Sequence, residues 1–231
     1  MGPLKDIKIF DLTRVLAGPH CTQILGDLGA DIIKIERVEA GDDTRKFAPP
    51  YMKDSDGKDT NQSAYFSGTN RNKRSLTLDL SSKDGQAIAK ELIAKSDILV
   101  ENFKVGTLKK YNLDYESLKD QFPNLIYCSI TGFGQTGPYA SRPAYDALVQ
   151  AMGGVMSLTG EPDGEPMKVG VSIADLMAGM YATVSILAAL RHRDKTNEGQ
   201  HLDISMLDEE VQDDVEETRR RMTRNSADHS A

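Results

Sequence analysis

The sequence has few of the residues that build disulfides or metal sites. It contains two cysteines, Cys21 and Cys128, and four histidines in 231 residues. None of the histidines forms a metal-ligand spacing with a cysteine or with another histidine. Two isolated cysteines, one in a predicted helix and one in a predicted strand, are typical of reduced thiols in a protein core. We therefore expect no metal site.

Long basic runs and a cationic leader are also absent. The formal net charge is −7, and no long basic stripe precedes residue 219. This argues against nucleic acid as the main partner. The first ten residues contain no cationic segment followed by an apolar one, which predicts a cytoplasmic protein without a signal peptide. Because hydrophobic residues make up 39% of the chain, we expect a folded core.

The longest apolar run is too short for a membrane span. Residues 170–190 are almost wholly apolar or small, but Asp175 leaves only residues 176–190 uninterrupted. That is roughly fifteen residues, whereas a span needs about 20. The run therefore predicts a buried core helix, and we expect no membrane as a partner.

Asp175 is the one carboxylate in that run, and two interpretations of it stay open. Ser172 and Asp175 have the S-x-x-D spacing of a capping box, in which the carboxylate only satisfies a backbone amide. The N-terminus of a helix also favours an ionised carboxylate, which is the form that a nucleophile requires. The spacing by itself favours the cap.

The first 36 residues predict a parallel β-α-β unit. Strands are expected at residues 8–12 and 31–36, with a helix at residues 19–28 that stops at Gly29. A right-handed crossover makes the two strands parallel. The turn after the first strand reads TRVLAGP and lacks the glycines of G-x-G-x-x-G. We therefore reject a dinucleotide site in which Glu36 would bind a ribose.

Strands and helices continue to alternate after this unit. Further strands are expected at residues 76–80, 97–100, 125–130 and 200–206, and helices at residues 82–96, 107–111, 115–121, 142–152 and 170–190. The alternation predicts an α/β fold with a mainly parallel sheet. The glycine-spaced loop at residues 131–138 follows a strand end, where ligands bind in such sheets. ATP binding is unsupported, because the loop has neither the spacing nor the lysine of a P-loop.

Basic residues near two strands are candidate anion ligands. Residues 70–75 form a basic cluster just before the strand expected at residues 76–80, and Arg37 follows the strand at residues 31–36. Each of these two groups is either a solvated strand end or a phosphate site. The polar, weakly periodic residues 40–69 form a long connection, and such connections tend to be functional.

The end of the chain differs in character from the rest. Residues 207–231 are charged, acidic first and basic second, with few large apolar side chains. This pattern predicts a solvated helix or a disordered tail. We therefore place a domain boundary there, so that residues 1–206 form the α/β domain.

A series of motifs along residues 3–208 resembles the class III CoA-transferase family (CaiB/BaiF type). The motifs lie, in order and with family-like spacing, at residues 11–19, 25–37, 41–45, 70–75, 100–103, 129–138, 145–146 and 169–175. Such a series is far more specific than any one of its motifs. Members of the family are nearly twice this length, so the resemblance implies a chain truncated after the first half.

The resemblance implies a doubly wound, Rossmann-like α/β sheet with flanking helices. It also implies an enzyme that moves coenzyme A from an acyl-CoA donor, such as succinyl-CoA, to a small carboxylic acid. Asp175 matches the family's covalent nucleophile, whose carboxylate attacks the thioester carbonyl. This match reverses the preference for a cap that the spacing alone gives.

The resemblance further implies the groups around that nucleophile. Arg37, Lys73 and Arg74 match contacts to the phosphates of coenzyme A, while Asn102 and Tyr145 match positions near coenzyme A or the substrate. No permanently bound cofactor is implied, because the CoA thioester is itself a substrate. The family forms interlocked homodimers, and much of that interlock comes from the part that this chain lacks.

Two other functions stay open. A truncated chain could bind coenzyme A without turning it over. In α-methylacyl-CoA racemases, which share the fold, a histidine and an aspartate move a proton from the positions that Tyr145 and Asp146 occupy here. A tyrosine is a poor base near neutral pH, so the transferase is favoured over the racemase.

Overall fold

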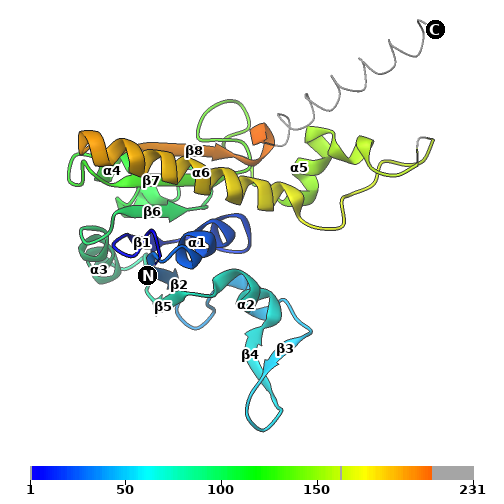
Figure 1. The fold of residues 1–231 in the computed structure, drawn as a ribbon, viewed down its shortest axis with the longest axis horizontal. Coiled ribbons are helices and arrows are strands. Elements are labelled where there is room, and N and C mark those ends of the chain that lie inside the picture. Colours follow the sequence, from blue (N-terminus) through cyan, green and yellow to red (C-terminus); the bar gives the residue numbers. More distant parts are fainter. Residues whose placement is uncertain (1, 162, 210–231) are drawn as a thin grey trace, which may run out of the picture.

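A parallel sheet lies at the centre of the protein (Figure 1). The computed structural model describes residues 2–161 and 163–209. Six strands of this part form the sheet: β1 (Lys8–Asp11), β2 (Asp31–Glu36), β5 (Lys73–Thr77), β6 (Ile98–Glu101), β7 (Ile126–Thr131) and β8 (His201–Ser205). Their order is β5-β2-β1-β6-β7-β8, and all neighbouring pairs are parallel. This is the order of doubly wound folds, so the predicted fold class is confirmed.

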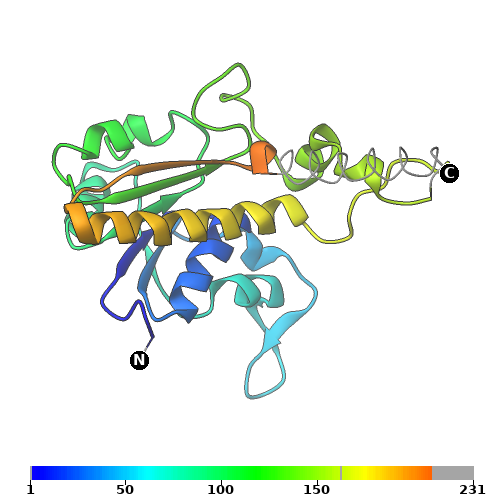
Figure 2. The same cartoon turned by 45° about the horizontal axis from the view of Figure 1, so that its top comes forward.

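Helices cover both faces of the sheet (Figures 1 and 2). One face carries α1 (Ala17–Asp27) and α6 (Ile173–Thr196), which pack side by side. The other face carries α3 (Lys83–Ile93), the 3-10 helix η2 (Leu108–Tyr111) and α4 (Tyr115–Leu118). Each face has its own apolar core, and this explains why the central strands are apolar on both sides.

The position of β5 corrects the prediction for this strand. It was expected at residues 76–80, but it begins at Lys73 and ends at Thr77. The basic cluster at residues 70–75 is therefore not a loop before the strand, because Lys73 and Arg74 are the first two residues of β5. Four of the five β5 residues are exposed at this edge of the sheet, so hydrophobicity is a poor guide to where the strand begins.

The long connection at residues 40–69 contains regular structure. Its elements are η1 (Asp43–Lys46), the antiparallel strands β3 (Tyr51–Lys53) and β4 (Asp59–Ser63), and the start of α2 (Ala64–Asn70). The β3–β4 hairpin projects away from the sheet (Figure 1). Because most of its described side chains are exposed, it carries no apolar alternation that would reveal it in the sequence.

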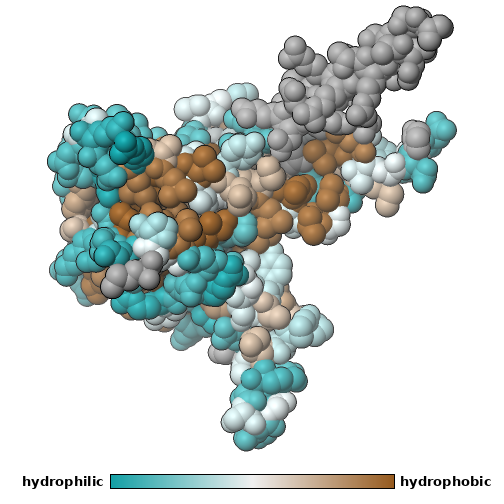
Figure 3. Space-filling view, viewed as in Figure 1, coloured by the Kyte–Doolittle hydropathy of each residue, from teal (hydrophilic) through white to brown (hydrophobic). Residues whose placement is uncertain are grey.

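α6 is the apolar run recognised in the sequence. By length and composition it could cross a membrane, but 44% of its most apolar window is buried, and it packs against α1, β7 and β8. Its outward side chains Met180, Val184 and Leu187 are exposed. They contribute to the apolar surface on this face of the molecule (Figure 3).

Two short elements complete the described chain before α6. α5 (Asp146–Gly153) begins four residues later than the helix expected at residues 142–152, and η3 (Val155–Leu158) follows it. A helical turn at residues 206–209 follows β8. The remainder of the predicted charged tail lies outside the described residues.

Gly179 lies where α6 packs tightly against the start of α1. A Cβ atom at this position would lie 2.7 Å from the carbonyl oxygen of Ala17. Gly68, inside α2, differs because a Cβ there would meet no atom within 4 Å.

These two glycines give a matched test of the packing. We expect Gly179→Ala to lower the free energy of unfolding by about 1–3 kcal/mol, because the helices must separate. Gly68→Ala should raise it by about 0.5–1 kcal/mol, because alanine is the better helix former. Urea unfolding measures both, and an equal gain from the two variants would contradict the close packing.

Candidate active site

Two adjoining cavities lie beside the point where the strand order reverses. β1 and β6 are neighbours at this point, and the chain leaves them in opposite directions, which opens a crevice at their carboxyl ends. The Asp175 cavity has a volume of ≈ 320 Å³, and the Arg37 cavity one of ≈ 460 Å³. Arg14 and Phe103 line both of them, so the two cavities are direct neighbours at this edge of the sheet.

Segments that follow the strands build the wall of the Asp175 cavity. The wall includes Arg14 and Val15 after β1, Asn102 and Phe103 after β6, Gly132 after β7, and Asp175 from the first turn of α6. Side chains far apart in the sequence meet here because parallel strands end at the same edge.

Asp175 is not a helix cap. Ser172, at the N-cap position of α6, makes no side-chain capping hydrogen bond. The Ala174 N–H instead donates to Asp146 Oδ1 at 3.0 Å, so a carboxylate from another helix satisfies this amide. Ala17, at the start of α1, lines the same cavity as Asp175, and its backbone N–H favours the ionised Asp175 carboxylate. The interpretation as a capping box is therefore wrong.

The surroundings of Asp175 make its carboxyl group unusually basic. Burial raises the pKa of Asp175 to about 6, and the nearby Asp146 carboxylate contributes to the rise. The Ala17 N–H opposes both effects. The group is therefore ionised at neutral pH but remains a stronger base than an exposed aspartate, which suits a carboxylate nucleophile.

Tyr145 and Asp146 do not form an acid–base pair. Tyr145 is 74% exposed and lines the Asp175 cavity. Asp146 is buried, and its oxygens accept hydrogen bonds from the Ala174 N–H and from Gln150 Nε2 at 2.7 Å. Lys168 Nζ lies 3.5 Å from the same carboxylate. Asp146 thus connects α5 to α6, and this arrangement gives no support to a racemase.

Asn102 joins the segments that follow β1 and β6. Its Oδ1 accepts from the Arg14 N–H at 2.8 Å, and its Nδ2 donates to the Arg14 carbonyl at 2.7 Å. Asn102 lines the Asp175 cavity, and its predicted role near coenzyme A or the substrate stays a prediction. Its amide is already paired with the backbone of Arg14.

The three predicted phosphate contacts lie in different places. Arg37 lines the Arg37 cavity and forms an ion pair with Asp43. The Lys73 side chain is only 2% exposed, and its Nζ lies 3.2 Å from Asp11 Oδ2. Burial lowers the pKa of Lys73 to about 8, although Asp11 opposes the shift.

Arg74 is the third of these residues, and it lies at the opposite end of the strands. Its guanidinium pairs with Asp31 at 2.7 Å, near the beginning of β2. The structure therefore brings Asp175, Asn102 and Tyr145 together with Arg37 along one crevice, but it does not bring Lys73 or Arg74 there. The phosphate roles of these two residues stay predictions.

Three cations of the Asp175 cavity are absent from the sequence-based prediction. They are Arg14, Lys104 and Arg142. Arg14 lies over the Phe103 ring at 5.0 Å, and Arg142 over the Tyr139 ring at 4.7 Å. The signal that could have found them is position, because each lies in a loop that follows the carboxyl end of a strand.

The structure gives no sign of a metal centre in the part that it describes. Among residues 2–161 and 163–209, no three His, Cys, Asp or Glu side chains gather closely enough to hold an ion. Cys21 and Cys128 are buried and unpaired with each other, as core thiols. Burial raises the pKa of Cys21 to about 12, which leaves this thiol unreactive.

The fold and the site together define a Rossmann-like α/β protein with a candidate carboxylate nucleophile at its switch point. A family model described as CoA-transferase family III matches residues 4–216. The chain therefore belongs to CoA-transferase family III.

Individual relatives agree with this assignment. A succinate–glutarate CoA-transferase of Agrobacterium fabrum is 52% identical over 206 residues, which are 89% of this chain and 51% of that protein. A succinyl-CoA:glutarate CoA-transferase of Mus musculus is 46% identical over 211 residues, 91% of this chain and 47% of the relative. This chain thus spans about half the length of these relatives.

A solved structure shows the same fold. The crystal structure of a CaiB/BaiF family protein from Brucella suis superposes with a TM-score of 0.86 at 50% sequence identity. The match covers 91% of this chain and 55% of that one. The doubly wound domain described above is therefore the part that the two proteins share.

The raised pKa of Asp175 predicts a pH-dependent change in stability. Folding raises this pKa from 3.8 to about 6, so the folded state binds the proton more tightly and its stability falls as pH rises through this window. Asp175→Asn removes the buried charge. We expect it to raise the free energy of unfolding by at most roughly 3 kcal/mol at pH 7.5 and by about half of that at pH 5.

Urea unfolding at the two pH values measures this difference. The exposed Asp120 serves as a control, and Asp120→Asn should change stability little at either pH. A gain from Asp175→Asn that is the same at both pH values would show that the Asp175 carboxylate is not buried as described.

Proposed function

We propose that this chain is a CoA-transferase that moves coenzyme A from an acyl-CoA donor to a small carboxylic acid, with Asp175 as the covalent nucleophile. The observation that carries the proposal is the Asp175 carboxyl group itself. It is mostly buried, has a raised pKa, and lines one of two neighbouring cavities that share Arg14 and Phe103. Membership of the family supports the same reaction.

The two cavities suit the two parts of a CoA thioester. The Arg37 cavity combines the guanidinium groups of Arg14 and Arg37 with the apolar side chains Leu78 and Phe103, which suit phosphates and an adenine ring respectively. A nucleotide bound there directs its pantetheine arm past Arg14 and Phe103 into the Asp175 cavity. The thioester carbonyl then meets the Asp175 carboxylate.

The reaction proceeds by exchange of acyl bonds at Asp175. Its carboxylate attacks the thioester carbonyl, which gives a mixed anhydride and releases the CoA thiolate. The thiolate attacks the aspartyl carbonyl of the anhydride, which frees the donor acid and leaves an aspartyl-CoA thioester. The acceptor carboxylate repeats these two steps in reverse and leaves as a new acyl-CoA. Each step exchanges one acyl bond for another, which is the advantage of covalent catalysis.

The charges of the Asp175 cavity suit small carboxylates. Arg14, Lys104 and Arg142 outnumber the carboxylates Asp43 and Asp175 in its wall, so the cavity attracts anions. The names of the relatives include succinate, glutarate and mesaconate. We propose succinyl-CoA as a donor and a small dicarboxylate as the acceptor.

The location and assembly that we propose follow the sequence-based expectations. We propose a cytoplasmic enzyme that uses no resident cofactor and requires neither nucleic acid nor membrane. Homodimers, which the family resemblance implies, are the assembly to test for this chain.

Binding without turnover is a second candidate function. Tyr145 lines the Asp175 cavity and is 74% exposed. The mixed anhydride needs protection from water, and a wall residue so exposed leaves the cavity open rather than covered.

A covalent adduct distinguishes the two candidates. After mixing with succinyl-CoA, we expect intact-protein mass spectrometry to show a CoA-sized or acyl-sized adduct that hydroxylamine removes. Asp175→Ala should abolish the adduct, while Asp120→Ala should retain it. Binding of CoA by calorimetry without any adduct would indicate the second candidate. The loss of both adduct and binding in the parent chain would contradict the transferase.

The phosphate site is tested by comparing two arginines. Arg37→Ala should weaken CoA binding by roughly tenfold, because it removes a charge-assisted contact to a phosphate. Arg74→Ala removes the same charge from the other end of the strands, and an unchanged affinity in this variant would favour the Arg37 cavity over the predicted phosphate role of Arg74. A loss with Arg74→Ala but not with Arg37→Ala would move the phosphates to the basic cluster at residues 70–75. Isothermal titration calorimetry with CoA gives both affinities.

A further inference from the structure

Side chains from other elements hold the backbone of the turn between β1 and α1. Lys34 Nζ, from β2, donates to the carbonyl oxygen of Thr13 at 2.8 Å. The Val15 N–H donates to Asp42 Oδ1 at 3.4 Å. Asn102 holds the intervening Arg14 through both its N–H and its carbonyl group. The turn is therefore fixed from three directions.

Val15 needs this support because its own backbone is strained. Its φ angle is +70°, in the left-handed region that β-branched residues rarely adopt. Such a conformation persists only where the surrounding structure imposes it. The hydrogen bonds at Thr13, at Arg14 and at the N–H of Val15 itself supply that constraint.

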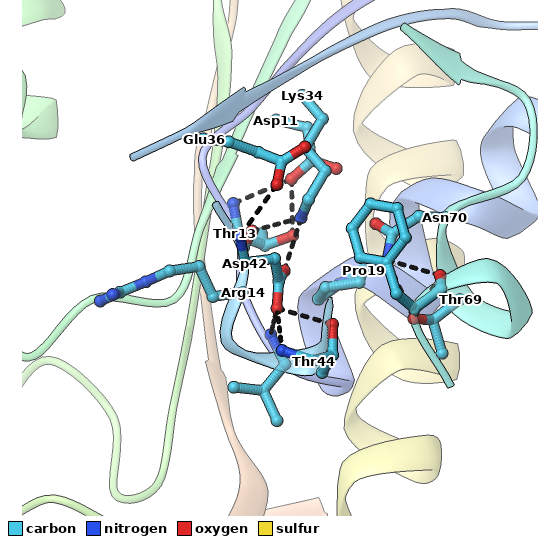
Figure 4. A network of polar contacts seen from close by, with 12 residues as sticks. Asp11, Thr13, Arg14, Pro19, Lys34, Glu36, Asp42, Thr44, Thr69 and Asn70 are labelled. Atoms are coloured by element: carbon cyan, nitrogen blue, oxygen red, sulfur yellow. Dashed lines mark hydrogen bonds and ion pairs between the residues drawn. The ribbon is translucent and has the colours of Figure 1, made fainter. Parts of the chain in front are cut away.

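Lys34 and Asp42 form a buried ion pair directly beneath the turn (Figure 4). Lys34 Nζ lies 2.9 Å from Asp42 Oδ2, and the two side chains are 1% and 0% exposed. Asp42 Oδ1 also accepts hydrogen bonds from the N–H and the hydroxyl of Thr44, at 2.9 and 2.7 Å. The pair thus links β2 and η1 to the turn.

The turn between β1 and α1 also positions two groups of the candidate active site. The Arg14 side chain leaves it to line both cavities. α1 begins two residues after Val15, at Ala17, which lines the Asp175 cavity and whose N–H favours the ionised Asp175 carboxylate. A change in the backbone at Val15 would move both groups relative to Asp175.

From these contacts we propose that Lys34 and Asp42 are positioning residues for the Asp175 site. Their buried ion pair holds the turn at residues 13–15 in the strained conformation that directs Arg14 into the crevice and the Ala17 N–H toward Asp175. Neither residue lines the Asp175 or the Arg37 cavity, so they act through the turn and not on the ligand. The proposal rests on Asp175 being the nucleophile proposed above.

The test replaces the pair by uncharged groups of similar size, in the double variant Lys34→Met/Asp42→Asn. Removing both charges avoids leaving one of them buried without a partner. We expect the Ala17 N–H to withdraw from Asp175, so that the carboxyl resonance of Asp175 titrates at higher pH in ¹³C NMR. Adduct formation with succinyl-CoA should slow by about 10- to 100-fold, whereas the affinity for CoA should change less than threefold.

A control separates positioning from a general loss of stability. Tyr127→Phe removes a buried hydrogen bond to the Leu113 carbonyl on the other face of the sheet, and should leave the Asp175 titration unchanged. If the double variant does not fold, Lys34→Arg replaces it, because arginine keeps the charge but cannot keep the geometry at Thr13.

The NMR titration needs no turnover, so it decides the proposal even if the parent chain forms no adduct. A parent adduct together with an unchanged Asp175 titration in the folded variant would overturn the positioning role and leave the proposed function intact. An equal shift in Tyr127→Phe would also overturn it. A shift confined to the Lys34 and Asp42 variants would support it.

Discussion

Pairing of buried charge is the constraint on which this structure depends. Asp11, Lys34, Glu36, Asp42 and Lys73 are all at least nine-tenths buried in side chain or in whole residue. Charges in such places are tolerated only when they are paired and hydrogen-bonded. Lys34 on β2 pairs with Asp42 before η1 (Figure 4), and Lys73 on β5 pairs with Asp11 on β1. Since each charge fixes its neighbour, the network sets the relative positions of elements that contribute to the crevice.

Glu36 and Asp175 are both largely buried, but their pKa values shift in opposite directions. Burial would raise the pKa of Glu36, but hydrogen bonds from Arg45, Ser75 and the Asp42 N–H lower it to about 2. Asp175 is also mostly buried, but the Ala17 N–H favours its ionised form too weakly to prevent a rise of its pKa to about 6. A carboxylate with many hydrogen bonds is a weak base, whereas a buried one with few retains basicity. Glu36 on β2 therefore suits a structural role, and Asp175 on α6 suits the proposed chemical one.

The sequence predicts the fold well where one physical signal is sufficient. β2 (Asp31–Glu36) and the start of α6 follow from apolar runs, and Ser82 caps α3 as its position suggests. The exposed β5 edge and the hairpin at residues 51–63 lack such a signal. In the candidate site, the motifs single out Asp175 and Arg37, each of which lines one of the two cavities. They do not reveal that Lys73 is buried against Asp11, because that contact joins β5 to β1 and depends on the sheet order.

The support of the β1–α1 turn has a consequence for its motion. Loops at ligand sites usually belong to the least stable parts of a protein and open without disturbing the core. This turn is attached to strands in the middle of the sheet, through Lys34 on β2 and Asn102 after β6. It can open only if those attachments break, so the amide of Arg14 should exchange with solvent as slowly as the central strands do. A substrate would thus reach Asp175, the proposed nucleophile, past a turn that stays rigid. Any mobility needed for substrate entry must come from other segments around the crevice.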